Sequence, residues 1–148
     1  MHVETHPIIM AHEPVLANAL LDTSAWADLK DCKGLWVIVD HYTGGDTDLV
    51  LEMHEGDAAS GTTAVANNFR IWVAGAALTD PTMVRQADAK TYTIDTGELT
   101  ASTKVAFYLD ASACKRYVQL GASGGNAGSI VSVTYIKEGA RYQGNQSY

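Results

Sequence analysis

Long hydrophobic runs are missing from this sequence of 148 residues. No apolar stretch approaches the roughly 20 residues that a transmembrane helix requires, so we expect no membrane as a partner. The N-terminus also lacks a basic stretch followed by an apolar run, which argues against a signal peptide. These absences predict a soluble protein that is made in a cytoplasm.

Basic residues are scarce as well. The chain has 10 Lys and Arg against 17 Asp and Glu, which gives a formal net charge of −7. Direct nucleic-acid binding needs clustered Lys and Arg to neutralise phosphates, and the sequence shows no basic stripe. We therefore expect no nucleic acid as a direct partner.

Cysteine is the next rare residue. Cys32 and Cys114 lie far apart and do not have the spacing of metal ligands. Two reduced, partly buried thiols are favoured over a disulfide. No segment repeats at a fixed period, which disfavours propeller and solenoid folds. A length of 148 residues with 47% hydrophobic side chains is enough for one domain with a substantial core.

Recognisable catalytic signatures are also lacking. No G-x-S-x-G motif occurs, and Cys114 has no histidine close in sequence. The loops TGGDTD and SGGNAGS superficially resemble phosphate-binding loops, but strands rather than helices follow them and neither carries the required lysine. Tight turns are the better interpretation. We expect no enzymatic activity, no catalytic residues and no cofactor.

Two groups of residues are weak candidates for a metal site. Asp46 and Asp48, with Thr47 between them, offer oxygen ligands for calcium but lack the further acidic ligands of an EF-hand loop. His41 and His54 would face each other across a hairpin, without a third ligand. Solvated turn carboxylates and isolated histidines explain these residues better, so the sequence predicts no metal site.

The stretch from Leu35 to Gly56 organises the rest of the chain. Leu35 to Val39 is apolar without a break, as expected of a strand buried on both faces. From Asp48 the pattern alternates, with Leu49, Leu51 and Met53 on one face. The same alternation is expected to put on one face, in two later segments, Val105, Phe107 and Leu109, and Val131, Val133 and Tyr135. The glycine- and aspartate-rich residues between the two strands suit a turn. A hairpin is the simplest connection, and a crossing between two stacked sheets is the alternative.

The whole chain gives about eight strands and short helical turns only. Expected strands cover 15–21, 35–39, 48–54, 66–74, 90–96, 104–109, 116–120 and 129–136, and expected helical turns lie at 24–29, at Asp80-Pro81 and at 110–115. Regular spacing of short strands predicts an all-β fold, either a β-sandwich or a barrel, and we favour a jelly-roll β-sandwich. The expected divisions are an N-terminal arm (1–14), the β-sandwich domain (15–140) and a C-terminal tail (141–148).

Aromatic residues are the remaining source of a functional surface. Trp36, Trp72 and the seven tyrosines of the chain could line a sugar-binding face, although core packing explains most of them more simply. Tyr42, Tyr108 and Trp72 are the candidates for a contact surface. Trp72 stands on the nominally outer face of its strand, which suggests that this face is also covered.

Several segments together resemble small virion proteins of tailed bacteriophages, in particular capsid decoration or cement proteins. They are HYTGGDTDLVLEMHE, FRIW, TYTIDTGE, KVAFYLDAS, YVQLGASGGNAGSIVSVTYI and RYQG, and they span roughly residues 35 to 144. The N-terminal arm lies outside the resemblance.

The resemblance implies a jelly-roll protein that binds the outside of the major capsid protein shell and stabilises the head. It also implies a homotrimer at threefold or quasi-threefold positions and a location on the capsid surface of the virion. The alternatives are a phage tail or head-fibre component and, from another class, a carbohydrate-binding β-sandwich module. The resemblance assigns no catalytic, cofactor or metal residues.

Overall fold

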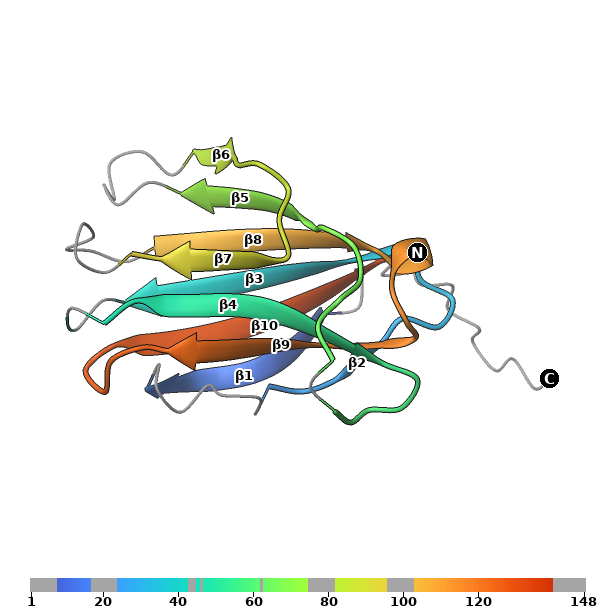
Figure 1. Ribbon diagram of the computed structural model, residues 1–148, viewed down its shortest axis with the longest axis horizontal. Helices are drawn as coiled ribbons and strands as arrows, with labels where there is room; N and C mark the ends of the chain where they lie inside the picture. Colours follow the sequence, from blue (N-terminus) through green and yellow to red (C-terminus); the bar gives the residue numbers. More distant parts are fainter. Residues whose placement is uncertain are drawn as a thin grey trace, which may run out of the picture.

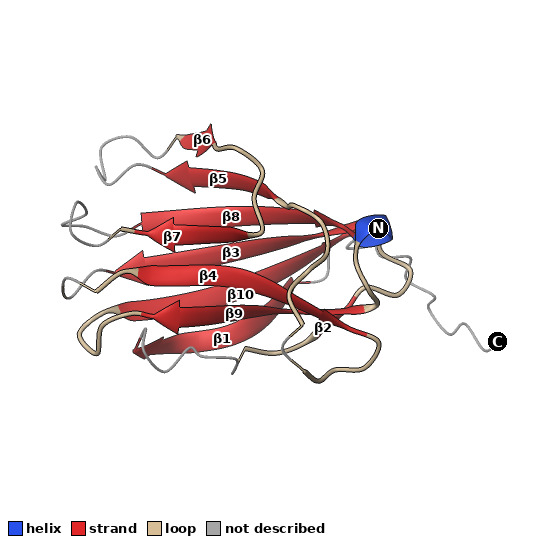
Figure 2. Ribbon diagram, in the orientation of Figure 1, coloured by secondary structure: helices blue, strands red, loops and turns tan. Residues whose placement is uncertain are grey.

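A computed structural model describes the backbone of residues 8–16 and residues 24–42, 45, 47–61, 63–74, 82–95 and 103–139 in full. These residues are almost all in strands, apart from loops and one short 3-10 helix, η2, at Ala111–Ala113 (Figure 2). Among them no helix is long and apolar enough to cross a membrane. The predicted all-β class is confirmed.

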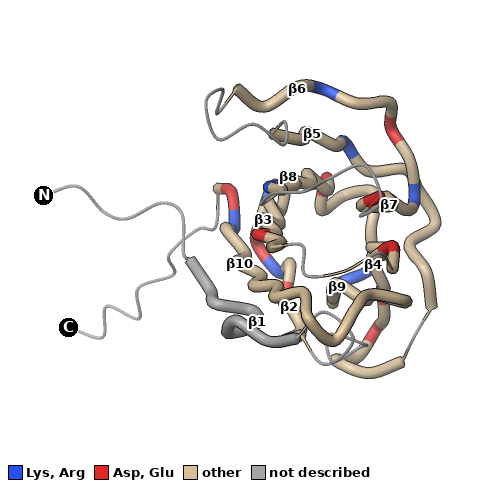
Figure 3. Tube along the Cα trace, turned by 90° about the vertical axis from the view of Figure 1, so that its left-hand side faces the viewer, with Lys and Arg blue, Asp and Glu red and all other residues tan. Residues whose placement is uncertain are grey.

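The strands form two antiparallel sheets that face each other (Figures 1 and 3). The six-stranded sheet has the order β1 (Ile8–Leu16), β10 (Ile130–Glu138), β3 (Gly34–Tyr42), β8 (Thr103–Asp110), β5 (Arg70–Ala74) and β6 (Met83–Arg85). The four-stranded sheet has the order β2 (Ala27–Asp28), β9 (Tyr117–Gly124), β4 (Leu49–Gly56) and β7 (Thr91–Ile94). The wider sheet extends past β7, so β5 and β6 lie at its far edge (Figure 1).

The strand order is that of a jelly roll. Without the hairpin β5–β6, eight strands remain, and counted along the chain they are ordered first-eighth-third-sixth in one sheet and second-seventh-fourth-fifth in the other. This is the double-sheet arrangement in which the chain crosses repeatedly from one layer to the other. The β5–β6 hairpin is an insertion between the fourth and fifth of these strands. The predicted jelly-roll sandwich is therefore confirmed.

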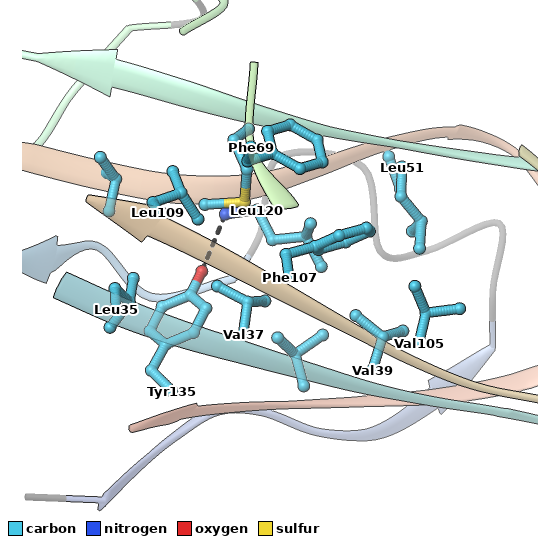
Figure 4. Packing of buried hydrophobic residues seen from close by; sticks show 14 of the residues in the cluster. Leu35, Val37, Val39, Leu51, Phe69, Val105, Phe107, Leu109, Leu120 and Tyr135 are labelled. Carbon is cyan, nitrogen blue, oxygen red and sulfur yellow. Dashed lines mark hydrogen bonds between the residues drawn. The ribbon is translucent and has the colours of Figure 1, made fainter. Parts of the chain in front are cut away.

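The core lies between the two sheets and follows the alternation expected from the sequence. Predicted inward residues of β4, β8 and β10 are all buried: Leu49, Leu51, Met53, Val105, Phe107, Leu109, Val131, Val133 and Tyr135. Phe107 lies edge-on to Phe69, with ring centroids 4.9 Å apart, near the middle of the packed layer (Figure 4). Burying these side chains is the main stabilising contribution to the fold.

The connection between β3 and β4 is a crossing between sheets, which corrects the simpler expectation of a hairpin. The prediction that Leu35–Val39 is buried on both faces is also wrong. Leu35 and Val37 are fully buried, but Trp36 and Ile38 are only partly buried. They lie on the outer face of the six-stranded sheet, which the smaller sheet does not cover, and their apolar character reflects a separate cluster on that face.

The sheet begins earlier than the predicted domain boundary at residue 15. Ile8 to Leu16 pairs with β10 as the outermost described strand, so this edge starts before the strand expected at 15–21. Its register shifts twice, between Met10 and His12 and between His12 and Val15. Pro14 falls in the second irregular step, and an edge strand tolerates a proline there because no ladder hydrogen bond needs its nitrogen. Residues 1–7 and 17–23 lie outside the described residues.

The sequence pattern did not predict two short strands, because two or three residues are too few to show an alternation of apolar and polar side chains. They are β2, which replaces the helical turn predicted at 24–29, and β6, which lies in the expected long connection. The Ser24 hydroxyl, at the start of that predicted turn, donates a hydrogen bond to the backbone carbonyl of Leu120 at 2.5 Å. The long-range bond to β9 therefore replaces the local cap.

The other boundaries differ less. The helical turn predicted at 110–115 is confirmed as η2, and the Asp110 carboxylate accepts the hydrogen bond from the Ser112 backbone nitrogen at 2.9 Å. Strand β5 starts at Arg70 rather than at residue 66, and β9 continues through Gly124 into the predicted loop. Asp80-Pro81 and the tail at 141–148 lie outside the described residues.

Residues 66–69 are irregular because Glu55 holds this part of the chain. Glu55 is 6% exposed, and its carboxylate accepts hydrogen bonds from the backbone nitrogens of Ala66 and Lys115, each at 3.0 Å. One buried carboxylate thus fixes the loop after β4 and the connection before β9. Charged acceptors with two backbone donors make strong hydrogen bonds.

We expect Glu55→Gln to lower the free energy of unfolding by about 1–3 kcal/mol, because the amide nitrogen of glutamine would face one of the two backbone donors. Urea denaturation measures the change. Asp57→Asn is the matched control, since Asp57 is exposed and forms an ion pair with the Lys115 ammonium at 2.9 Å. Its effect should stay within about 0.5 kcal/mol. Equal effects of the two substitutions would contradict this role for Glu55.

Candidate interaction surface

The outer face of the six-stranded sheet carries a continuous line of aromatic and arginine side chains. We call these five residues the aromatic row: Arg85, Trp72, Trp36, Tyr108 and Arg70. The Arg85 guanidinium carbon lies 4.8 Å from the Trp72 ring centroid, and the Arg70 guanidinium carbon lies 5.3 Å from that of Tyr108. Between these ends, the Trp36 ring centroid is 5.0 Å from Trp72 and 5.0 Å from Tyr108. A guanidinium thus lies at each end of a series of three tilted rings.

Strand register explains why these residues meet. Trp36 lies opposite Tyr108, Tyr108 lies opposite Arg70, and Trp72 lies opposite Arg85. Trp72 is also opposite Ala106, whose small side chain leaves room for the two indoles to meet above β8. Cross-strand aromatic pairs and cation–π contacts each contribute favourable energy beyond area burial.

Glycine at position 34 is required by the same cluster. A Cβ atom added to Gly34 would overlap the hydroxyl end of Tyr108 and the carbonyl of Leu109. The absence of a side chain at Gly34 therefore leaves room for the hydroxyl end of Tyr108 at the start of β3. Partial burial raises the pKa of Tyr108, and its hydrogen bond to Glu138 adds to the shift. The phenol thus stays neutral at physiological pH.

The two arginines of the row have different electrostatic surroundings. Arg85 forms an ion pair with Asp88, three residues later. For Arg70, none of the described carboxylates lies within 4.0 Å of the guanidinium. Hydrogen bonds from Ser112 are the main cause that lowers the pKa of the Asp110 carboxyl group. The positive charge of Arg70 lowers that pKa further. Arg70 is therefore an exposed cation without an ion-pair partner in the described part of the chain.

The rest of this face carries both an ion pair and exposed apolar side chains. Asp40 and Lys104 form an ion pair at 2.9 Å, beyond the row toward the other end of the strands. Past that pair, Tyr42 and Ile130 lie opposite each other and are 57% and 44% exposed. Of the three predicted contact residues, the structure therefore brings Trp72 and Tyr108 together and leaves Tyr42 apart.

Trp36 and the two arginines were not among the predicted contact residues. Trp36 lies within an unbroken apolar run, which concealed its outward direction. The alternation of side chains along β3, combined with the pairing of β3 with β8, would have identified Trp36 as an outward residue near Tyr108. The register between strands that are distant in sequence cannot be read from one strand alone.

A shallow pocket of about 190 Å³ opens at the Arg70 end of the row. Its lining includes Arg70, Tyr108, Asp88, Asp110 and Cys114. Burial is the main cause that raises the pKa of the Cys114 thiol to about 11, so it is protonated at neutral pH. A protonated thiol is a poor nucleophile.

Both cysteines are unpaired, which confirms the prediction of reduced thiols. Each is partly buried, and burial also raises the pKa of Cys32. Neither thiol therefore has the lowered pKa of a reactive cysteine.

The two histidines considered as metal ligands do not face each other across a hairpin. His41 lies on the inner face of β3, whereas His54 lies on β4 of the other sheet with its Nε2 atom 3.1 Å from a Glu52 carboxylate oxygen. The expected hairpin between them does not exist. Asp46 lies outside the described residues. Across the described ranges, no group of three or more His, Cys, Asp or Glu side chains is arranged to hold a metal ion.

Gly45 and Asp48, two described residues of TGGDTD, lie beside the SGGNAGS segment. The Asp48 carbonyl accepts a hydrogen bond from the Gly125 backbone nitrogen at 2.8 Å, and Gly124 has a φ of 76°. The Asn126 side chain accepts a hydrogen bond from the Gly128 nitrogen at 2.7 Å. These contacts support the interpretation of SGGNAGS as a tight turn.

We expect the free energy of unfolding to fall as the pH drops below about 6.5 because His41 is buried, and burial lowers its pKa. At pH values between the folded and unfolded pKa of His41, the unfolded chain binds the proton more readily. The free energy of unfolding therefore falls by up to about 1.4 kcal/mol per pH unit. Urea denaturation from pH 7.5 to 5 tests this. His41→Gln should give a flatter profile; an unchanged slope would show that other groups cause the loss.

Comparisons with known proteins do not identify the chain. No protein-family model matches it, and no curated protein matches it. Among solved structures, the coat protein of Tobacco streak virus aligns over 100% of this chain and 96% of its own, with 11% identity and a TM-score of 0.21. A TM-score at this level supports no inference about fold or function.

Proposed function

We propose that this chain is a structural protein of a virion, a capsid decoration protein that binds the outside of a tailed-phage head. The observation that carries the proposal is the aromatic row on the uncovered face of the six-stranded sheet. Tryptophan, tyrosine and arginine are the residues most enriched at the energetic centres of protein interfaces. The jelly-roll fold and the sequence resemblance to phage virion proteins support the same function.

The row suits a protein partner better than a sugar. Carbohydrate binding by stacking needs open ring faces, but guanidinium groups lie over Trp72 and Tyr108. The rings are also inclined to Trp36, by 43° for Trp72 and 57° for Tyr108, so they do not form a flat platform. A carbohydrate-binding module remains the second candidate because three aromatic rings share one exposed face.

The proposed partner is the major capsid protein, and the proposed state on the head is a homotrimer. Several copies of one contact in a symmetric assembly add through effective concentration, so individually weak contacts give firm attachment. The protein would be located at the capsid surface after synthesis in the host cytoplasm. A tail or head-fibre component would use the same kind of surface on another virion protein.

Cosedimentation with phage heads that lack this protein tests the proposal. We expect saturable binding with a fixed number of copies per head, and slower disruption of decorated heads on heating. Polysaccharides should not compete. No binding to heads, together with retention on a polysaccharide column, would replace the virion function with the carbohydrate-binding one.

A further inference from the structure

The two ends of the aromatic row differ in a way that points to the chemistry of the partner. Arg85 is neutralised by Asp88 within the same chain. Arg70 is exposed, stacks on Tyr108 and has no ion pair with any described carboxylate. A stacked guanidinium is held in place with its edge available, which lowers the entropy lost when it forms two parallel hydrogen bonds to a carboxylate.

We infer that the partner surface places an aspartate or glutamate carboxylate on Arg70 while an apolar side chain beside it packs on Trp36. This inference rests on the proposed function and specifies the capsid protein segment that meets the row. The paired charges would lie at the edge of an apolar contact, where neighbouring side chains exclude water. In that setting a hydrogen bond between two charged groups contributes more than an exposed ion pair does.

A protein carboxylate fits the overall charge better than a nucleic-acid phosphate does. A duplex carries one negative charge per about 1.7 Å of its axis, and a chain with a net charge of −7 would be repelled by so dense a polyanion. Basic and acidic positions are interspersed along the described chain, without a basic stripe (Figure 3). One carboxylate next to an apolar residue meets one available guanidinium without that repulsion.

Arg70 and an arginine outside the row, Arg116, give a matched pair of variants. Arg70→Gln should weaken binding to heads that lack this protein by about 10- to 100-fold, the loss typical for a hydrogen bond to a charged partner. It should also make binding less sensitive to salt between 50 and 300 mM NaCl. Arg116→Gln is the control, because the Arg116 guanidinium lies 5.0 Å from the Tyr117 ring centroid and pairs with Asp28 beside the four-stranded sheet, away from the row. This substitution should change affinity less than threefold. Thermal denaturation confirms that both variants are folded.

The outcomes separate this inference from the proposed function. Arg70→Gln binding as tightly as the unaltered chain, while Trp36→Ala loses binding, would overturn the carboxylate partner and leave the decoration function standing. Equal losses in Arg70→Gln and Arg116→Gln would also overturn it, because the loss would then not depend on a guanidinium in the row. Failure of the unaltered chain to bind any head would overturn both.

Discussion

Trp36→Ala is expected to weaken binding to phage heads by about 30-fold or more. Trp36 is the central ring of the aromatic row and contacts both Trp72 and Tyr108 at 5.0 Å between centroids. Removing it leaves the outer rings without their common neighbour and removes the largest apolar surface at the centre of the face. Truncating such a central tryptophan typically costs 2 kcal/mol or more of binding free energy, which corresponds to about 30-fold.

Trp26→Ala is the control for this substitution. Trp26 is partly exposed like Trp36 but precedes β2, at the edge of the four-stranded sheet. Its replacement should leave head binding within about threefold of the unaltered chain. A loss of binding in Trp26→Ala equal to that in Trp36→Ala would mean that the aromatic row is not the contact surface.

Tyr135→Ala is expected to lower the free energy of unfolding by about 3–5 kcal/mol, the range for truncating a fully buried aromatic side chain. Tyr135 is 0% exposed and extends from β10 across the core to the other sheet (Figure 4). Its hydroxyl oxygen accepts a hydrogen bond from the Leu120 backbone nitrogen at 2.8 Å and lies 3.3 Å from the Ser24 hydroxyl oxygen. Burial raises the pKa of Tyr135 to about 12, so the hydroxyl stays neutral.

Tyr135→Phe separates the ring from the hydroxyl. The phenylalanine ring fills the same space, but the Leu120 nitrogen loses its acceptor in a part of β9 that the two residues of β2 do not reach. We expect a loss of about 1–3 kcal/mol, the cost of leaving a buried donor unsatisfied. Urea denaturation of the three proteins measures both steps. A Tyr135→Phe variant as stable as the unaltered chain would show that the hydroxyl does not link the sheets.

The sequence was informative wherever one strand face is buried and the other is not. In β4, β8 and β10 the alternation predicted the inward residues correctly, because the period of two is a local property of an extended chain. Length and spacing then predicted a sandwich of short strands. The edge strand β1 was placed too late because Pro14 interrupts the alternation within it.

The aromatic row was only partly predictable. Trp72 and Tyr108 were identified because each large ring alternates with the apolar residues before and after it and so stands on the outer face, which is visible within each strand. Their meeting with Trp36 depends on the pairing of β3 with β8 and of β8 with β5, between residues up to 72 positions apart. The arginines that cover the outer rings come from two further register pairs. Such long-range pairing cannot be predicted from the residues of a single segment.

Oxidative footprinting of the tryptophans, with the protein free and bound to heads, tests most directly whether the aromatic row is the capsid contact. Hydroxyl radicals label Trp36 and Trp72 in the free protein because both are partly exposed, and Trp26 provides an internal reference away from the row. We predict that binding to heads protects Trp36 and Trp72 while labelling of Trp26 stays unchanged. Unchanged labelling of Trp36 and Trp72 on fully decorated heads would contradict the assignment of this face to the capsid.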